Sequence, residues 1–257
     1  TLVTDPPGAA VTLFRYELSD RRLCPVLERE LGTTPLVRVP VRRGSYLCVL
    51  RAPGREEVRY PVLVGRDDHW DGRAPGEPLP RPIALPPAGE LGPDDVYVPA
   101  GWCWTGGDPE ATDGLPAQRL WVEGFVIRRF PVTNAEYVEF LNDLVASGRE
   151  AEAQAAAPRS ERGPSGGGER RPVLERDPRG RFILPEGDDP AWQPGLLVVQ
   201  IDWHAASAFA RWLAARTGEP WRLPGEIERE KAARGVDGRI FPWGDHGDPT
   251  FACVLES

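Results

Sequence analysis

The sequence predicts an α+β protein in which a small all-β sandwich module precedes a larger, irregular domain of helices and strands. Three observations support this fold class. Short β-rich runs occupy residues 1–70, a Pro- and Gly-rich stretch follows at 71–93, and signals for helix starts and stops occur within 94–257. With 28 Gly and 29 Pro in 257 residues, the chain favours loop-rich architecture over long helices.

The first module is expected from four β-rich runs that Gly and Pro residues separate. The runs are residues 11–14, 36–39, 44–50 and 58–62. Short strands at this spacing, with turn residues between them, are typical of a small β-sandwich. Residues 71–93 contain few apolar side chains to bury, so we expect an extended linker of semi-rigid character there.

Three helices are expected in the second domain from the residues at their ends. Thr133 and Glu136 can form the two halves of a capping box, in which each side chain accepts from the other's backbone N–H. Apolar residues follow at helical spacing, and Gly148 suits the end of the helix. The end signals of the two further helices place them at residues 202–216 and 224–235.

Between the first two helices, residues 149–171 are expected to form a flexible insertion. Its Ala-rich half could extend the preceding helix, whereas the Gly-rich half around Gly166-Gly167-Gly168 has nothing to pack. Beyond the insertion, residues 177–184 predict a turn that leads into a strand.

The composition argues against two kinds of partner. The net charge is −8 and acidic and basic residues are interleaved, whereas binding to a phosphate backbone requires a concentrated basic face, so nucleic acid is not expected. No stretch approaches the roughly 18 apolar residues of a membrane span. The chain contains no Met, and we expect it to be a piece of a longer protein. No targeting signal is visible in the sequence, so the cellular compartment of the protein is undecided. We slightly prefer the cytoplasm.

The cysteines and histidines show no metal-binding pattern. Four cysteines lack CxxC spacing and three histidines are scattered singly, so a zinc site is not expected. Cys24 and Cys48 lie in one module and could form a disulfide, but free buried thiols explain them equally well. The other two cysteines are Cys103 and Cys253.

Charged and aromatic residues are concentrated toward the C-terminus. Four charged residues spaced four apart would form one row on the surface of a helix. The row could be exposed to solvent, could be a partly buried network that ties loops together, or could be catalytic. We prefer the network. Four tryptophans of the same region are predicted to anchor the core rather than to bind ligand, because aromatic side chains bury large areas. These two sets are Arg222, Glu226, Glu230 and Arg234, and Trp203, Trp212, Trp221 and Trp243.

The strongest motif runs from Val198 to Gly244. It contains Asp202-Trp203, Arg222-Leu223-Pro224 and Trp243-Gly244, and upstream pieces follow in fitting order at 98–101, 122–125 and 131–137. In order and spacing, these blocks resemble the signature of the formylglycine-generating enzyme, or sulfatase-modifying factor, family. The resemblance covers residues 94–257. It implies that the signature residues form a scaffold, namely Asn134, Asp202, Trp203, Arg222, Leu223, Pro224, Glu226, Glu230, Arg234, Trp243 and Gly244.

The resemblance also implies a fold and a chemistry. The fold is a compact, irregular α+β structure similar to C-type lectin-like domains. Family members use molecular oxygen to convert a cysteine of a sulfatase to formylglycine, and their active-site cysteines and their calcium and copper sites fall in the later half of the domain. We expect that half to lie beyond residue 257, so that the domain is truncated and this chain holds no catalytic residue, metal ligand or cofactor.

The chain departs from the family pattern at three places. Gly225 stands where Thr is usual after Leu-Pro, and Arg229 stands where Trp is usual before the last Glu. Family members often carry a carboxylate two residues before the proline that corresponds to Pro116, near the substrate peptide. This chain has Gly114 there, with Asp113 beside it, so Asp113 is a candidate substrate contact.

The first module carries a resemblance of its own. Pro6-Pro7-Gly8-Ala9, Leu31-Gly32-Thr33-Thr34-Pro35 and Arg43-Gly44-Ser45-Tyr46 resemble a PEGA-type β-module. Such modules are similar to binding or spacer domains of bacterial multidomain proteins. Together with the second domain, the arrangement resembles C-terminal regions of some bacterial Ser/Thr protein kinases, which implies an upstream kinase domain.

Two functions follow as alternatives. The preferred one is a ligand-binding or regulatory module of a larger bacterial protein, with a protein or peptide as the ligand. The other is a formylglycine-generating oxidoreductase whose catalytic cysteines lie beyond residue 257, because such catalysis needs an activated thiolate. A role like that of ergothioneine synthases, which bind iron through histidines of a preceding helical bundle, is disfavoured by the three histidines and the β-module.

Overall fold

The computed structural model of the chain describes residues 1–66, 68–160, 172–187 and 189–252. Its contacts divide these residues into two compact units. The first unit combines residues 1–129 with the described residues from 224 onward, and the second unit is Phe130–Leu223. The mixture of helices and small sheets confirms the predicted α+β class.

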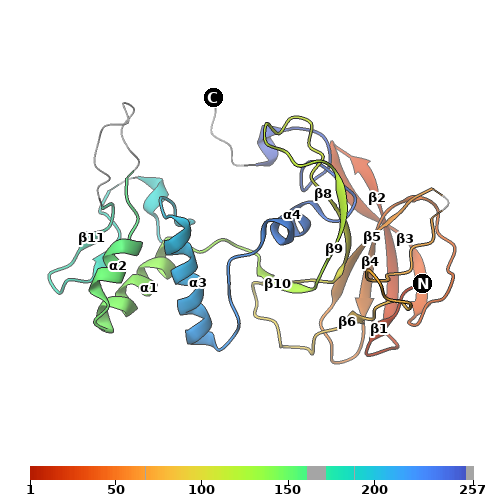
Figure 1. Cartoon of the computed structure of the whole chain (residues 1–257), viewed down its shortest axis with the longest axis horizontal. Coiled ribbons are helices and arrows are strands. Elements are labelled where there is room, and N and C mark those ends of the chain that lie inside the picture. The colour runs from red at the N-terminus through yellow and green to blue at the C-terminus, as the bar shows by residue number, and fades with distance from the viewer. Residues whose placement is uncertain (67, 161–171, 188, 253–257) are drawn as a thin grey trace. The chain divides into compact units, whose positions relative to one another are not determined.

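The first unit is built on a four-stranded antiparallel sheet with the order β3-β2-β4-β5 (Figure 1). Because successive side chains of a strand point to opposite faces, one face of this sheet carries Leu13, Cys48 and Val62, all buried in the main core of the unit. The strands are β2 (Ala10–Ser19), β3 (Arg22–Thr33), β4 (Gly44–Arg51) and β5 (Val58–Val64).

The segment that was expected as a linker contributes to this core. Strand β6 (Ile83–Ala84) pairs in parallel with β1 (Thr4–Asp5), and Ile83 and Leu85 are buried against the sheet. Ala74 is buried as well. The few apolar residues of 71–93 thus cover the core face of the four-stranded sheet. The β1–β6 pair and the adjoining loops take the place of the second sheet of a sandwich.

Two further expectations for the first module differ from the structure. Residues 36–39 form no strand, and only Leu36 makes an isolated bridge, to Leu2. Val37 is 65% exposed and Arg38 has a φ of 51°, which no strand tolerates. Strand β3 was not predicted because most of its side chains are exposed, so it lacks an alternating apolar pattern.

The family-like part of the first unit packs against the opposite face of the sheet. Two antiparallel pairs, β7 with β10 and β8 with β9, and helix α4 form a small core of Cys103, Val122 and Val236, against which Leu63 of β5 packs. The bounds are β7 (Asp95–Val98), β8 (Gly101–Thr105), β9 (Gln118–Val122), β10 (Phe125–Arg128), α4 (Glu226–Arg234) and a 3-10 turn at Pro249–Phe251.

The second unit is mainly helical and has its own core. Tyr137, Phe140 and Phe209 pack ring against ring with centroids 5.3–5.7 Å apart, beside Trp212. Helix α1 has the predicted capping box at Thr133. The elements are α1 (Asn134–Ala146), α2 (Glu150–Ala156), β11 (Glu175–Arg176), β12 (Phe182–Ile183), a 3-10 turn (Pro190–Trp192) and α3 (Trp203–Thr217).

The expected insertion is partly helical. Its Ala-rich half forms the separate helix α2, whose Ala153 and Ala156 are buried in the core of the second unit. The Gly-rich half, residues 161–171, lies outside the described residues. No helix of the described chain is long and apolar enough to cross a membrane.

Candidate functional site

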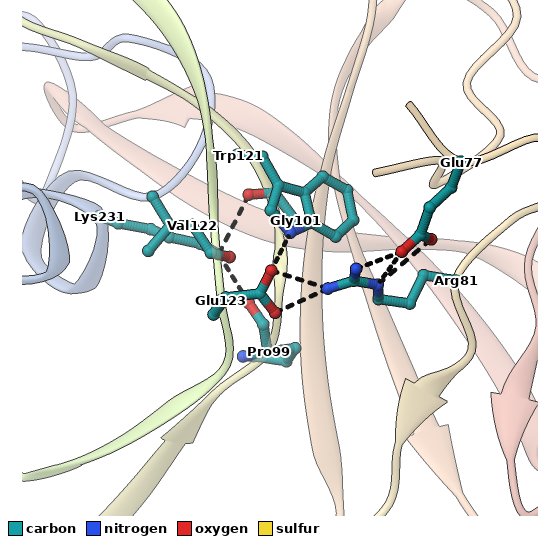
Figure 2. Close-up of polar contacts among 8 residues, drawn as sticks. All are labelled: Glu77, Arg81, Pro99, Gly101, Trp121, Val122, Glu123 and Lys231. Carbon is teal, nitrogen blue, oxygen red and sulfur yellow. Dashed lines mark hydrogen bonds and ion pairs between the residues drawn. The ribbon is translucent and has the colours of Figure 1, made fainter. Parts of the chain in front are cut away.

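Helix α4 is fixed to the strands of the first unit by a buried cation. Lys231, which is the only lysine of the sequence, is 4% exposed. Its Nζ donates to the carbonyl oxygens of Pro99 at 2.7 Å and of Gly101 and Val122 at 3.3 Å (Figure 2). Three acceptors match the three donors of an ammonium group, so each buried N–H donor has a partner.

The thiols of Cys48 and Cys103 are not activated. Burial lowers the pKa of Lys231 to about 8 and raises the pKa of the nearby Cys103 thiol. Burial also raises the pKa of Cys48 to about 12. Cys24 and Cys48 are both free, so the disulfide alternative is not realised, and Cys253 lies outside the described residues. A buried, protonated thiol is a poor nucleophile, so neither Cys48 nor Cys103 is suited to attack a substrate.

A second polar cluster ties the 71–93 segment to β9. The Arg81 guanidinium donates to both carboxylate oxygens of Glu123 at 2.7 Å and pairs with Glu77 (Figure 2). The indole N–H of Trp121 donates to the same Glu123 carboxylate at 3.0 Å, and Arg81 lies 5.4 Å from the Trp121 ring centroid. The hydrogen bond from Arg81 lowers the pKa of Glu77. This cluster positions the outer surface of β9.

Glu230 and Arg234 of α4 hold the turn that follows β8. Glu230 accepts from the backbone N–H of Gly106 at 2.8 Å and pairs with Arg234. Arg234 also donates to the carbonyl oxygens of Gly238, at 3.1 Å, and of Arg239. The pair is largely buried, at 20% and 13% side-chain exposure, so these two residues form the loop-tying network. Arg222 precedes the helix and is not part of it.

A buried ion pair joins the segment after α4 to the four-stranded sheet. Asp237 and Arg239 are 2.6 Å apart, and the Ser45 hydroxyl of β4 donates to Asp237 at 2.6 Å. Arg239 lies 4.5 Å from the ring centroid of Tyr16 on β2. Burial raises the pKa of Asp237, but hydrogen bonds from Arg239 and Ser45 outweigh it and hold that pKa below its ordinary value.

The outward face of β8 lines a tryptophan-rich hollow. Two adjoining cavities of about 340 and 150 Å³ share Asp68, Trp70, Trp102 and Arg119 as lining residues, and Trp104 lines the smaller one. We call these two cavities together the Trp hollow. Trp104 is 37% exposed although it is a large aromatic side chain. Because Cys103 faces inward, its neighbours Trp102 and Trp104 face outward by strand alternation.

The side chains of the Trp hollow are held in place by their neighbours. The Trp102 indole N–H donates to the Arg73 carbonyl at 2.8 Å, and its ring meets Trp121 edge-on with centroids 5.8 Å apart. The guanidinium of Arg119 lies 5.1 Å from the Trp102 centroid, a cation–π contact. The Trp104 backbone N–H donates to the carbonyl of Val236 at 3.2 Å. The hollow is therefore a shaped site with an exposed aromatic wall.

A larger cavity of about 780 Å³ lies over the core face of the four-stranded sheet, lined by residues of β2–β5 and of the segments 36–41 and 68–73, among them Arg38, His69 and Trp70. For the calcium and copper ions that the family resemblance implies, the described residues offer no suitable donor set, because they hold no group of three His, Cys, Asp or Glu side chains that could bind a metal ion.

The predicted signature residues are distributed over both compact units. In the second unit, Asn134 donates to the carbonyls of Ala191 and Gln193 at 2.9 and 2.8 Å, and Asp202 caps α3. Trp203, Arg222 and Leu223 belong to the same unit, and Pro224, Glu226, Glu230, Arg234, Trp243 and Gly244 belong to the first unit. Asn134 and Asp202 thus hydrogen-bond to local backbone, and a scaffold role for the whole set stays a prediction.

Several individual residues differ from what the sequence suggested. Trp203 is 67% exposed, so it does not anchor a core; it opens α3 and contacts the His204 ring at its edge. Trp243 instead stacks on Phe241 with centroids 5.1 Å apart. Asp113 is exposed in the loop between β8 and β9. Gly225 still caps α4, because its backbone N–H donates to Glu228 at 2.7 Å.

Sequence reasoning did not find Lys231 or the Trp hollow. The partners of Lys231 lie 109–132 residues away in the sequence, so no local pattern announces them. The only sequence feature that could have drawn attention to Lys231 is that it is the single lysine among 31 basic residues. For the Trp hollow, the alternation of Trp102 and Trp104 around Cys103 was a usable sign of a strand with an aromatic outer face.

Comparison with known proteins identifies the family. The model of the sulfatase-modifying factor enzyme 1-like domain matches residues 84–253, about two thirds of the chain. The chain belongs to this family.

Three relatives are similar to this chain over part of their length. The mouse (Mus musculus) formylglycine-generating enzyme is 29% identical over 79% of this chain and 55% of its own length. The mouse inactive C-alpha-formylglycine-generating enzyme 2 is 31% identical over 60% of this chain and 52% of its own. The serine/threonine-protein kinase Pkn1 of Chlamydia trachomatis serovar L2 is 24% identical over 91% of this chain and 39% of its own. The chain thus spans about half or less of the length of these relatives.

Proposed function

We propose that this chain is a ligand-recognition part of a larger bacterial protein, in which the sulfatase-modifying-factor domain binds a ligand instead of oxidising a cysteine. The observation that carries the proposal is the Trp hollow. It is an open, shaped cavity lined by the exposed Trp104, the half-buried Trp70 and Trp102, and the exposed guanidinium of Arg119. Concave sites lined by aromatic residues and a few polar groups are the usual form of ligand sites.

The thiols of Cys48 and Cys103 are not suited to the catalysis of the family. Cys48 and Cys103 are buried, and burial raises both pKa values, so at neutral pH both remain protonated. Catalysis of the family type requires a thiolate that the substrate can reach. The fold is shared by both functions and does not decide between them.

The relatives support the multidomain setting. The match to the kinase Pkn1 extends over 91% of this chain, which includes the β-module ahead of the family domain. The mouse relative named as inactive shows that the family contains proteins so described. On this basis the β-module is taken to be PEGA-like, and a kinase domain is the fusion partner that we propose.

The second candidate function is formylglycine generation. The relative named formylglycine-generating enzyme, which matches 79% of this chain, favours it. In that case the reactive thiols would come from residues that the printed sequence does not contain. The Trp hollow would then serve a subsidiary role.

The two functions are separated by an activity assay on the full-length protein. The protein is incubated in air with a synthetic peptide that carries the cysteine sequence of a sulfatase, and aldehyde formation is followed with a hydrazide reagent. The mouse formylglycine-generating enzyme serves as the positive control. We expect no aldehyde above the background without enzyme. Aldehyde formation above that background would replace the proposal by the second candidate.

A further inference from the structure

The Trp hollow has the size of a small-molecule site. Its larger cavity of about 340 Å³ lies within the range of about 300–1,000 Å³ that is common for ligand pockets, and the second cavity of about 150 Å³ extends it. The two cavities continue into each other along Trp70 and Trp102. A compact ligand of one or two rings fits these dimensions better than an extended chain.

The aromatic wall is preorganised. Trp102 is fixed by its hydrogen bond to the Arg73 carbonyl, by the edge contact with Trp121 and by the guanidinium of Arg119. A ligand that stacks on a ring already held in one orientation loses less side-chain entropy on binding. The indole N–H of Trp102 is already used, so the ring offers a ligand its apolar face and not a donor.

The charged groups of the hollow balance. Asp71 and Arg73 form an ion pair at 2.8 Å, and Asp68 and Arg119 supply one further charge of each sign. Among the described residues, the Arg119 guanidinium contacts the Trp102 ring and has no carboxylate partner. A hollow with no net charge, one donor group and one acceptor group does not favour a phosphate or another polyanion, which would require a surplus of positive charge.

We propose that the Trp hollow binds a neutral pyranose sugar, as a mono- or disaccharide or as the end of a glycan; this rests on the proposed recognition function. The apolar C–H face of the sugar ring stacks on the exposed Trp104 indole beside the half-buried Trp102. Sugar hydroxyls both donate and accept, so they accept from Arg119 and donate to Asp68. A peptide is less suited, because the Trp102 N–H that would bond its carbonyl is occupied by Arg73.

The test is binding of neutral sugars to the whole chain. A glycan microarray is screened first, and the best neutral glycan is then titrated by calorimetry, with cellobiose, lactose and chitobiose as defined soluble probes. Trp104→Ala and Arg119→Gln are each expected to weaken binding at least tenfold. Trp203→Ala is the matched control, because Trp203 is exposed and belongs to the other compact unit, and it is expected to leave the affinity within twofold.

If Trp104→Ala fails to fold, the proposal is tested instead by acrylamide quenching of the tryptophan fluorescence of the folded proteins, with and without sugar. The bound sugar is expected to protect the fluorescence of the unaltered chain and of Trp203→Ala. If the chain binds only acidic glycans or peptides, and Arg119→Gln weakens that binding, the neutral-sugar assignment is wrong. The proposed recognition function is then still supported. Absence of neutral-sugar binding also overturns the assignment. Only aldehyde formation in the peptide assay would remove the recognition function as well.

Discussion

At the scale of single residues, the buried charge of Lys231 makes stability depend on pH. Burial lowers the pKa of Lys231 in the folded chain to about 8, below the ordinary value of 10.5. Above pH 8 the folded chain has released this proton while the unfolded chain still binds it. The free energy of unfolding therefore rises with pH between about 8 and 10.5, by up to about 3 kcal/mol from this group.

The prediction is checked against Lys231→Met, which has no such group. Unfolding in urea is measured for both proteins from pH 7.5 to 10, and the difference in unfolding free energy is expected to shift steadily in favour of the unaltered chain. Titrating groups that do not interact with Lys231 cancel in this difference, whereas the Cys103 thiol, whose pKa the Lys231 charge lowers, contributes to it. A difference in unfolding free energy that does not change between pH 7.5 and 10 would show that the pKa of Lys231 is not lowered in the folded chain.

Thr105 is a second residue whose surroundings give a clear expectation. It is 1% exposed, and its hydroxyl has no hydrogen-bond partner among the described residues. Thr105→Val keeps the shape and removes a buried polar atom, so we expect the free energy of unfolding to stay unchanged or to rise by up to about 1 kcal/mol. Urea unfolding followed by tryptophan fluorescence measures it.

Thr34 supplies the matched control. It is equally buried, but its hydroxyl accepts from the backbone N–H groups of Gly8 and Ala9 at 3.1 and 3.0 Å and bonds to the Thr4 hydroxyl at 2.5 Å. Thr34→Val should lower the unfolding free energy by about 1–3 kcal/mol, since it leaves the buried Ala9 N–H without its acceptor, whereas the Gly8 N–H keeps its bond to the Thr34 carbonyl. Equal losses for both variants would mean that Thr105 has a partner, such as a buried water.

At the scale of elements, the turn between β8 and β9 depends on the absence of a side chain at Gly106. The φ of Gly106 is +67°, and an added Cβ would lie 2.6 Å from the carbonyl oxygens of Leu115 and Pro116. Gly54 has nearly the same φ, +69°, in the same compact unit, but open space around it. Both alanine variants carry the left-handed strain of about 1 kcal/mol, and only Gly106→Ala adds the collision.

We therefore expect Gly106→Ala to lower the unfolding free energy by about 2 kcal/mol more than Gly54→Ala does, because the neighbouring atoms are backbone and must shift. Since Glu230 accepts from the Gly106 N–H, the loss should be accompanied by faster amide exchange in α4. If the two variants unfold at the same denaturant concentration, the turn is less tightly packed than the structure shows.

The elements divide into those that local sequence determines and those that it does not. The helix after Thr133 was predictable because its capping box is complete within four residues, and the Asp202 and Gly218 ends of α3 are equally local. Strand β3 was not predictable, since its exposed side chains follow no apolar alternation and only pairing with β2 makes it a strand. The Trp hollow depends on segments that the chain brings together from residues 68–76, 102–104 and 119.

At the scale of the whole molecule, the β-module and the family domain are not independent. The family match begins at residue 84, yet the compact unit starts at Thr1 and includes the described residues from 224 onward. Leu47 and Val49 of β4 are 3% and 2% exposed on the face opposite the main core, and Leu63 of β5 packs against Cys103, Val122 and Val236. The sequence alone suggested a separate module, because its short strands and the following prolines resemble a domain and a linker.

The last prediction follows from this shared core: residues 1–93 produced alone should not form a stable module. Removing the family domain would expose the apolar face at Leu47 and Val49 and would leave Ser45 without Asp237. A small domain has little stability to lose, so we expect aggregation or poorly dispersed amide signals in a heteronuclear NMR spectrum. The matched test in the whole chain is Asp237→Asn, which weakens the pairing with Arg239 and should destabilise by about 2–4 kcal/mol. A cooperative unfolding transition and dispersed spectrum for residues 1–93 would show that the module folds by itself and that its contact with the family domain is secondary.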